Sequence, residues 1–212
     1  VSMSGGTLDA NNNLTLSGAL SHTGNITIDV YSNKTLTYSG TAINVGANTI
    51  TLSGGGSFVS GGMTLNDAQS KLLLNSITLD SASTSANSLG LDVDANSTVT
   101  AFSVGHITPV SIKAGRSLSG AVTVTAGSIK LGETGTLASA VSMSGGKLEA
   151  DESLTLSGPL TQSGNITIAV AENKTLGYSG AAVNLGAKTL TMSGKGTFNN
   201  SNALILNNAS SK

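Results

Sequence analysis

Short segments in which apolar and polar residues alternate recur along the whole chain. They take the form VSMSG, LTLSG, LTYSG or a close variant, and they begin at Val1, Leu14, Leu36, Ile50, Val141, Leu154, Leu176 and Leu190. Alternation over three to five residues that stops at Gly, Asn or Asp predicts a short β-strand followed by a turn. No stretch has the spacing of an amphipathic helix. The pattern therefore predicts an all-β protein.

The sequence contains a long internal repeat. Residues 1–58 align with residues 141–198 without a gap, and 37 of these 58 positions are identical, which is far above chance. The match continues with a one-residue slip, because Leu65–Lys71 returns as Leu206–Lys212. We interpret residues 1–140 as a first repeat unit and residues 141–212 as a partial second copy, continuous with the first in one solenoid.

Positions that recur in both copies suggest which side chains point inward and which form turns. Tyr38/Tyr178 and Phe58/Phe198 recur and are predicted to be interior, whereas Tyr31 becomes Ala171 and is predicted to be exposed. Three asparagine pairs also recur, Asn25/Asn165, Asn33/Asn173 and Asn44/Asn184. We expect them at turns, because Asn tolerates the left-handed conformation and bonds nearby backbone.

Strands this short and this frequent favour stacking over hairpin pairing. Three strands per turn give about 20 residues per coil, hence seven coils per repeat unit and about ten in the chain. Stacked about 4.8 Å apart, the coils would align their Leu, Ile and Val side chains in columns and pair each backbone with its neighbours. We predict a right-handed parallel β-helix, since parallel crossovers are right-handed. An array of β-sandwiches would need longer strands.

The composition argues against several classes of partner and of site. The net charge is −1 and the ten Lys and Arg residues are scattered, so we expect no nucleic acid partner. No apolar run approaches the length that a bilayer requires, so we expect no membrane insertion. The absence of cysteine excludes disulfides and thiolate metal sites. The chain also opens in mid-pattern at Val1, which suggests that further repeats flank it.

The phrases LTLSG, GNITI and KTLTYSG resemble those in the β-helical stalks of large exported bacterial proteins. These are the filamentous-haemagglutinin-like and autotransporter adhesin families, and the resemblance covers essentially the whole chain. It implies a right-handed parallel β-helix that is secreted or held at the bacterial cell surface. It also implies a role in adhesion, biofilm or matrix.

One acidic stretch offers a weak candidate for a metal site. Asp92, Asp94 and Asn96 alternate with apolar residues, so on a strand they would share one face and could offer oxygen ligands to Ca²⁺. The spacing lacks the Gly and Glu that complete a calcium loop. A solvated strand face explains the same pattern, and we expect no other cofactor.

Catalytic groups are sparse. His22 and His106 lie in different parts of the repeat, and His22 is replaced by Gln162 in the second copy. Arg116 and Lys113 are neighbours without a nearby carboxylate in sequence, although stacking of coils could bring Asp92 or Asp94 close to them. We therefore expect no enzyme activity.

The predicted function is that of a structural rod or stalk segment in a repetitive extracellular adhesin or matrix fibre. Its expected partners are further copies of the repeat, packed end to end or side by side, and glycans. The alternative is a carbohydrate-active β-helix of the polysaccharide-lyase or glycan-binding kind. A matrix fibre of stacked strands, as in functional amyloid, is a third interpretation.

Overall fold

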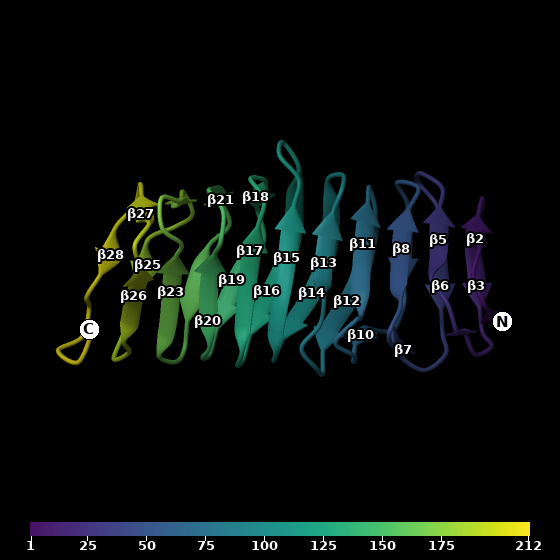
Figure 1. Cartoon of the computed structure of the whole chain (residues 1–212), viewed down its shortest axis with the longest axis horizontal. Helices are drawn as coiled ribbons and strands as arrows, with labels where there is room; N and C mark the ends of the chain where they lie inside the picture. The colour runs from purple at the N-terminus through teal and green to yellow at the C-terminus, as the bar shows by residue number, and fades with distance from the viewer.

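The computed structural model describes all 212 residues as 28 β-strands without a helix (Figure 1). Ten strands form one long sheet, the ten-stranded sheet, in chain order. They are β2 (Thr7–Ala10), β5 (Ile26–Val30), β8 (Thr49–Ser53), β11 (Lys71–Asn75), β13 (Gly90–Val93), β15 (Ile107–Ile112), β17 (Ser128–Gly132), β20 (Lys147–Ala150), β23 (Ile166–Val170) and β26 (Leu190–Gly194).

A second sheet of fourteen strands lies behind the first. Its main path holds β3 (Leu14–Leu16), β6 (Thr35–Tyr38), β9 (Ser57–Val59), β12 (Thr78–Thr84), β14 (Ser97–Val104), β16 (Ser117–Val124), β18 (Thr136–Leu137), β21 (Leu154–Leu156), β24 (Thr175–Tyr178) and β27 (Thr197–Asn200). The strands within both sheets pair in parallel with those of the preceding and following coils.

A narrow third side completes each coil. It contains β1 (Ser2–Met3), β4 (Ser21–His22), β7 (Ile43–Asn44), β10 (Met63–Leu65), the second halves of β12, β14 and β16, and then β19 (Ala140–Met143), β22 (Leu160–Gln162), β25 (Val183–Asn184) and β28 (Leu204–Ile205). Pairing runs without interruption from β7 to β22, but β1–β4 and β25–β28 form separate two-stranded pieces.

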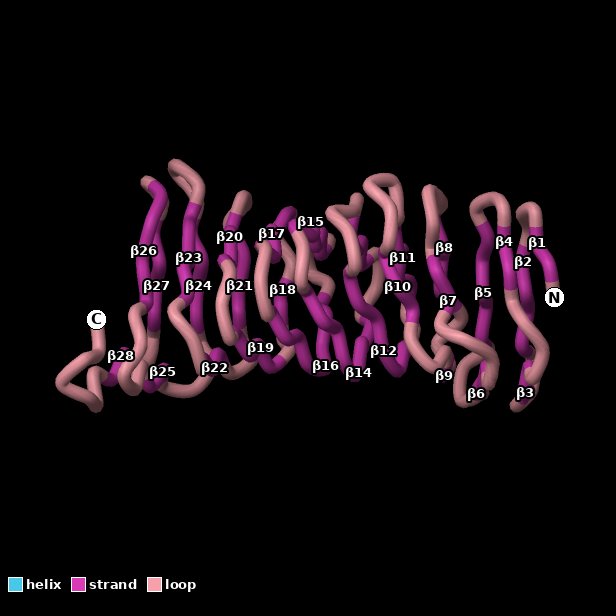
Figure 2. The backbone as a smooth tube through the Cα atoms, turned by 90° about the horizontal axis from the view of Figure 1, so that it is seen from below, coloured by secondary structure: helices cyan, strands magenta, loops and turns pink.

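The chain therefore winds as a parallel β-solenoid of ten coils, as predicted (Figures 1 and 2). The strands of the ten-stranded sheet rise at the front of Figure 1 while the coils advance from the N terminus to the C terminus, which is right-handed winding. Paired positions lie between 19 residues apart, as for Leu72 and Leu91, and 24 apart, as for Ile26 and Ile50. The expected coil of about 20 residues is confirmed, with turns that vary in length.

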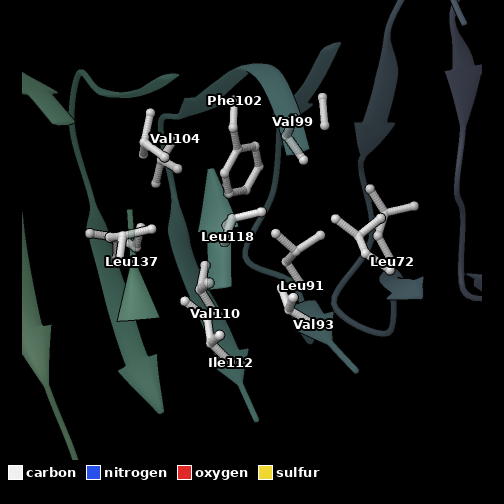
Figure 3. Close-up of a cluster of buried hydrophobic side chains, with 14 of the residues drawn as sticks. Leu72, Leu91, Val93, Val99, Phe102, Val104, Val110, Ile112, Leu118 and Leu137 are labelled. Carbon is white, nitrogen blue, oxygen red and sulfur yellow. The ribbon is translucent and has the colours of Figure 1, made fainter. Parts of the chain in front are cut away.

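The interior is one continuous apolar cluster of 46 buried residues, from Ala10 in the first coil to Leu185 in the ninth, with Leu190 and Phe198 of the last coil partly buried against it. Figure 3 shows its central part. Inward positions on successive coils stack in columns, because parallel strands in register place like-facing side chains above one another. Full burial of each such aliphatic side chain stabilises the fold by roughly 1.5–3 kcal/mol. The two copies share this core, and β20 of the second copy pairs directly with β17 of the first.

Equivalent residues of the two copies do not lie in one column. The column of Leu8 runs through Ile28, Leu52, Leu74, Val93 and Ile112. The column of Leu148, which aligns with Leu8, runs through Thr108, Ile129, Ile168 and Met192. Thr108 and Ile112 are four residues apart on one strand, and an even shift keeps inward residues inward.

The recurring tyrosines close a gap in the third side. Strand β4 is not paired with β7, nor β22 with β25. At this point the buried Tyr38 hydroxyl accepts a hydrogen bond from the Leu20 amide at 3.1 Å, and Tyr178 does the same for Leu160. Both tyrosines and Phe58 are interior as predicted, and Tyr31 is exposed. Phe198 in the last coil is only half-buried, and its ring stacks on that of Tyr178.

The three recurring asparagine pairs have different positions. Asn44 and Asn184 lie in the short strands β7 and β25, so the prediction of a turn is wrong for them. Asn33 and Asn173 adopt left-handed φ angles of 60° and 62°, as predicted for turns. Asn25 and Asn165 instead accept hydrogen bonds from amides of the next coil, those of Thr49 and Thr189. The expectation of bonding to nearby backbone is wrong for this pair, because stacking brings a residue 24 positions away closer than the local turn does.

Both ends of the solenoid leave core positions uncovered. Leu14 in the first coil and Met192, Leu204 and Leu206 at the C-terminal end are exposed, although they occupy inward or near-inward positions of the pattern. The outer edges of β2, β3, β26 and β27 pair with no further strand. The apolar column and the backbone ladder are thus open at both ends.

Candidate functional site

Charged side chains gather on one side of the solenoid. The six ion pairs all join residues of the ten-stranded sheet or of the turns that directly follow its strands. They are Lys71–Asp92, Lys113–Asp94, Lys130–Glu149, Lys147–Glu149, Lys174–Glu152 and Lys195–Glu172. Most of them bridge adjacent coils. Solvent-exposed pairs contribute little each, about 0–1 kcal/mol, so this side is primarily a solvated surface.

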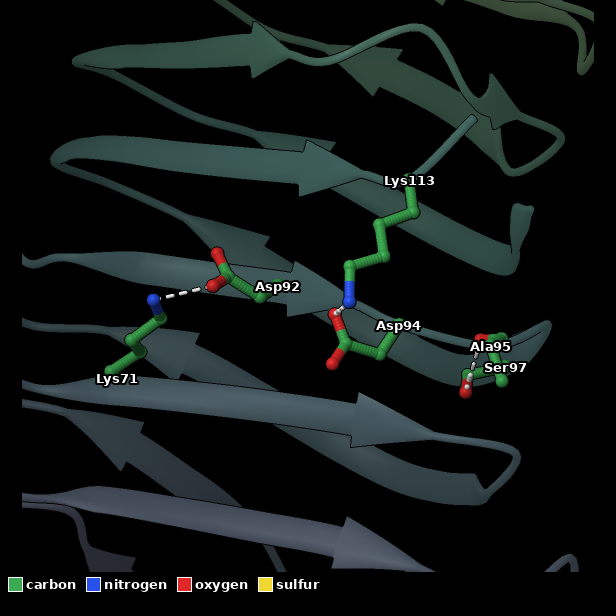
Figure 4. Close-up of polar contacts among 6 residues, drawn as sticks. All are labelled: Lys71, Asp92, Asp94, Ala95, Ser97 and Lys113. Carbon is green, nitrogen blue, oxygen red and sulfur yellow. Dashed lines mark hydrogen bonds and ion pairs between the residues drawn. The ribbon is translucent and has the colours of Figure 1, made fainter. Parts of the chain in front are cut away.

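The three candidate calcium ligands have separate partners, and Figure 4 shows those of the two aspartates. Asp92 pairs with Lys71 of the preceding coil, and Asp94 pairs with Lys113 of the following coil at 2.7 Å. The Asn96 Oδ1 accepts the Ser117 amide at 3.0 Å. Both carboxylates would have to release a lysine to bind a cation. No group of three or more His, Asp or Glu side chains gathers anywhere in the chain.

Stacking brings Asp94 to Lys113, as the spacing of the coils predicted, but it does not extend to Arg116. The exposed Arg116 guanidinium forms no ion pair, and the Arg116 amide closes a turn with the Lys113 carbonyl at 2.9 Å. One carboxylate and one ammonium therefore meet here on the open surface.

The histidines lie on different coils and have different surroundings. Both ring nitrogens of His22 lie within hydrogen-bonding distance of carbonyl oxygens, at 3.2 Å from Gly24 and 3.0 Å from Asn44. Gln162 replaces it in the second copy and donates to the Leu185 carbonyl at 3.2 Å. Position 22/162 thus connects coils where strand pairing is interrupted. His106 is exposed before β15.

Glu149 is the acidic residue with a perturbed titration. Its partial burial raises the pKa, but the hydrogen bond and charge of Lys147 together with the charge of Lys130 outweigh burial. The net effect is a pKa below the ordinary value of 4.5. Lys147 lies 2.8 Å from one carboxylate oxygen, and Lys130 of the preceding coil lies 3.5 Å from the other.

The fourteen-stranded sheet and the third side are nearly free of charge. Asp80, at the corner between them, is turned toward the preceding coil and accepts hydrogen bonds from the Ser60 amide and hydroxyl and from the Gly61 amide. This contact was not predicted from the sequence. The Gly61–Gly62 pair about one coil before a single Asp was the available signal.

The main surface hollows are lined by uncharged residues, mostly Ser, Thr, Gly and Ala, with larger apolar side chains such as Phe102, Met143 and Phe198 among them. One lies over Ser76, Thr78, Thr98 and Ser119, and none of the four main hollows includes a titratable residue. Such a surface can donate and accept hydrogen bonds at many points.

Comparison with known proteins leaves the family open. The chain forms no helix that could cross a membrane. No protein-family model matches the chain, and neither the curated proteins nor the solved structures contain a significant match.

Proposed function

We propose that this chain is a non-catalytic structural segment of a rod or stalk, within a large repetitive bacterial protein that is secreted or displayed at the cell surface. The observation that carries the proposal is the uninterrupted buried core, which extends through nine successive coils from Ala10 to Leu185. A solenoid of this kind lengthens by adding coils and keeps its cross-section.

The repeat supports extension in a specific way. Residue 140 leads into Val141 within one continuous strand, β19, so one copy passes into the next without a linker. The 140-residue unit supplies seven strands of the ten-stranded sheet, from β2 to β17, and hence seven coils. One further unit would therefore lengthen the rod by about 34 Å.

The test is a chain in which residues 1–140 are placed once more before Val1. Small-angle scattering should show a maximum dimension greater by about 34 Å with an unchanged cross-sectional radius. A thicker or folded-back particle would contradict the rod.

Incubation of the protein with pectin-like and alginate-like polysaccharides tests the alternative function. It should release no unsaturated sugars, and their release would favour the carbohydrate-active alternative.

A further inference from the structure

A row of hydroxyl groups runs along the third side, outside the charged surface. Thr64, Ser83, Ser103, Thr123, Ser142 and Thr161 stand at paired positions on six consecutive coils. We call these six residues the hydroxyl face. The last four are exposed and the first two are half-buried. Neighbours in the row bond one another at the far end, where the hydroxyls of Ser142 and Thr161 lie 3.0 Å apart.

The columns that flank the hydroxyl face contain small side chains. On one side Ser81 pairs with Ala101 and Ala121 pairs with Ala140. On the other side the following outward positions are Ser85, Gly105, Thr125, Ser144 and Ser163. Asn66 beside Thr64 and Pro159 beside Thr161 are larger residues at the two ends of these columns. On the four coils of Ser83, Ser103, Thr123 and Ser142, no side chain in the three columns is longer than threonine, so another surface can approach the backbone closely there.

The hydroxyl face is also uncharged. Asp80 at the adjoining corner is held by Ser60 and Gly61, and the ion pairs all lie on or beside the ten-stranded sheet. Contact through the charged side would remove lysines and carboxylates from water, which is unfavourable. Contact through the hydroxyl face avoids that cost.

We propose that the hydroxyl face is where a second copy of this chain packs, side by side with the first. Each hydroxyl can both donate and accept, so the face is complementary to itself, as a two-fold symmetric contact requires. The distance between successive coils is the same in both copies, so each hydroxyl of one row can lie opposite a hydroxyl of the other along the whole face. The exposed aromatic residue that a sugar ring could stack on, Tyr31, follows β5 of the ten-stranded sheet and is absent from this face.

The area sets the strength of this contact. Three columns about 7 Å apart over six coils span roughly 400 Å² on each partner, about half of what stable complexes bury. Two single chains should therefore associate only weakly. In the rod proposed above, on which this inference rests, contacts on successive units would add and the association would strengthen with length.

Cysteine variants test the face directly, because the natural chain has no cysteine. Ser103→Cys and Thr123→Cys place a thiol at the centre of the face, and Ser111→Cys places one on the ten-stranded sheet as a control. With diamide as oxidant at about 0.1 mM protein, both central variants should form disulfide-linked dimers about tenfold faster than the control. Adding Thr123→Lys to Ser103→Cys should remove that advantage through like-charge repulsion.

Equal rates in all three cysteine variants would overturn the side-by-side contact. If the rates are equal and the natural chain is also retarded in gels that contain a neutral polysaccharide, the hydroxyl face is better explained as a surface that binds a glycan. Scattering from dilute protein separates the two proposals. A rod with equal cross-linking rates overturns the hydroxyl face alone, whereas a particle that is not a rod overturns the proposed function.

Discussion

At the residue scale, the Tyr–Ser–Gly phrase explains how the core accommodates a polar atom. The Tyr178 hydroxyl accepts the Leu160 amide at 3.1 Å and donates to the Ala181 carbonyl at 2.5 Å. A Cβ at Gly180 would lie 2.7 Å from this hydroxyl. The glycine is therefore needed for space, so that the tyrosine can replace the missing strand pairing.

Tyr178→Phe should lower the free energy of unfolding by about 1–3 kcal/mol, because a buried amide loses its acceptor. Urea denaturation followed by circular dichroism measures the change. Tyr31→Phe is the matched control, since this tyrosine is 54% exposed and its hydroxyl makes no hydrogen bond, and it should leave the midpoint unchanged. Similar losses in both variants would show that the bridge does not stabilise the fold.

Gly54 is constrained by its backbone and by its neighbour. Its φ is 103°, and a Cβ would lie 2.3 Å from the Val30 carbonyl oxygen. Gly54→Ala should cost about 1–3 kcal/mol from backbone strain alone. At Gly18 an added Cβ would meet no atom within 4 Å, so Gly18→Ala should be neutral or slightly stabilising. Thermal melts of both variants measure the difference. If Gly54→Ala has the same melting temperature as the natural chain, the backbone of this coil can shift to accept the side chain, and glycine is not required at this position.

Inward and outward positions could be predicted from the sequence, because alternation depends only on the strand itself. Apart from the approach of Asp94 to Lys113, the partners of polar side chains could not be predicted. Asp92 meets Lys71, and Asn25 meets Thr49, across coils whose lengths differ by several residues. Small differences in turn length decide such register, and the alternation does not encode them.

At the scale of elements, adjacent strands of the ten-stranded sheet are coupled by charge as well as by their ladder. Glu149 on β20 accepts Lys147 from its own strand and faces Lys130 from β17, whose positions pair directly with those of β20. This arrangement stabilises the ionised carboxylate in the folded state and lowers its pKa below 4.5.

The sign of the pH dependence follows from that shift. Because the folded pKa is lower than the unfolded one, the contribution to stability is present above pH 4.5 and is lost as the pH falls through the folded value. Glu149→Gln should therefore lower the melting temperature at pH 7 and converge with the natural chain in more acidic buffer. Asp151→Asn, in the exposed turn that follows, is the control. A constant difference between pH 7 and pH 3 would contradict the assignment.

The number and kind of elements were largely predictable, but the third side was not. Its strands are as short as two residues, and its pairing stops between β4 and β7 in one copy and between β22 and β25 in the other. Both stops coincide with the longest coils, in which paired positions are 24 residues apart. The sequence shows the Tyr-Ser-Gly phrase that recurs near both stops, but the tyrosine bridge depends on three-dimensional contacts between coils.

At the scale of the whole molecule, stability in a solenoid depends on having a neighbouring coil on each side. Interior coils gain contacts above and below, whereas end coils gain them on one side only, so stability should decline toward both ends. The repeat places identical phrases at different distances from an end. LTLSG occurs in β3, which pairs only with β6, and again in β21, which pairs with both β18 and β24.

Leu14→Ala and Leu154→Ala isolate this effect, because the side chain, the phrase and the position in the repeat are the same. Leu154 is 7% exposed and Leu14 is 45% exposed. Leu154→Ala should cost about 2–5 kcal/mol, whereas Leu14→Ala should cost under about 1 kcal/mol. Hydrogen exchange should show the same order, with amides of β3 exchanging faster than those of β21.

In the chain with an added unit before Val1, Leu14 gains a preceding coil, and the cost of its replacement should rise to that of Leu154. A cost that stays low there would mean that the added unit does not stack on the first coil, and that the rod does not grow by adding coils.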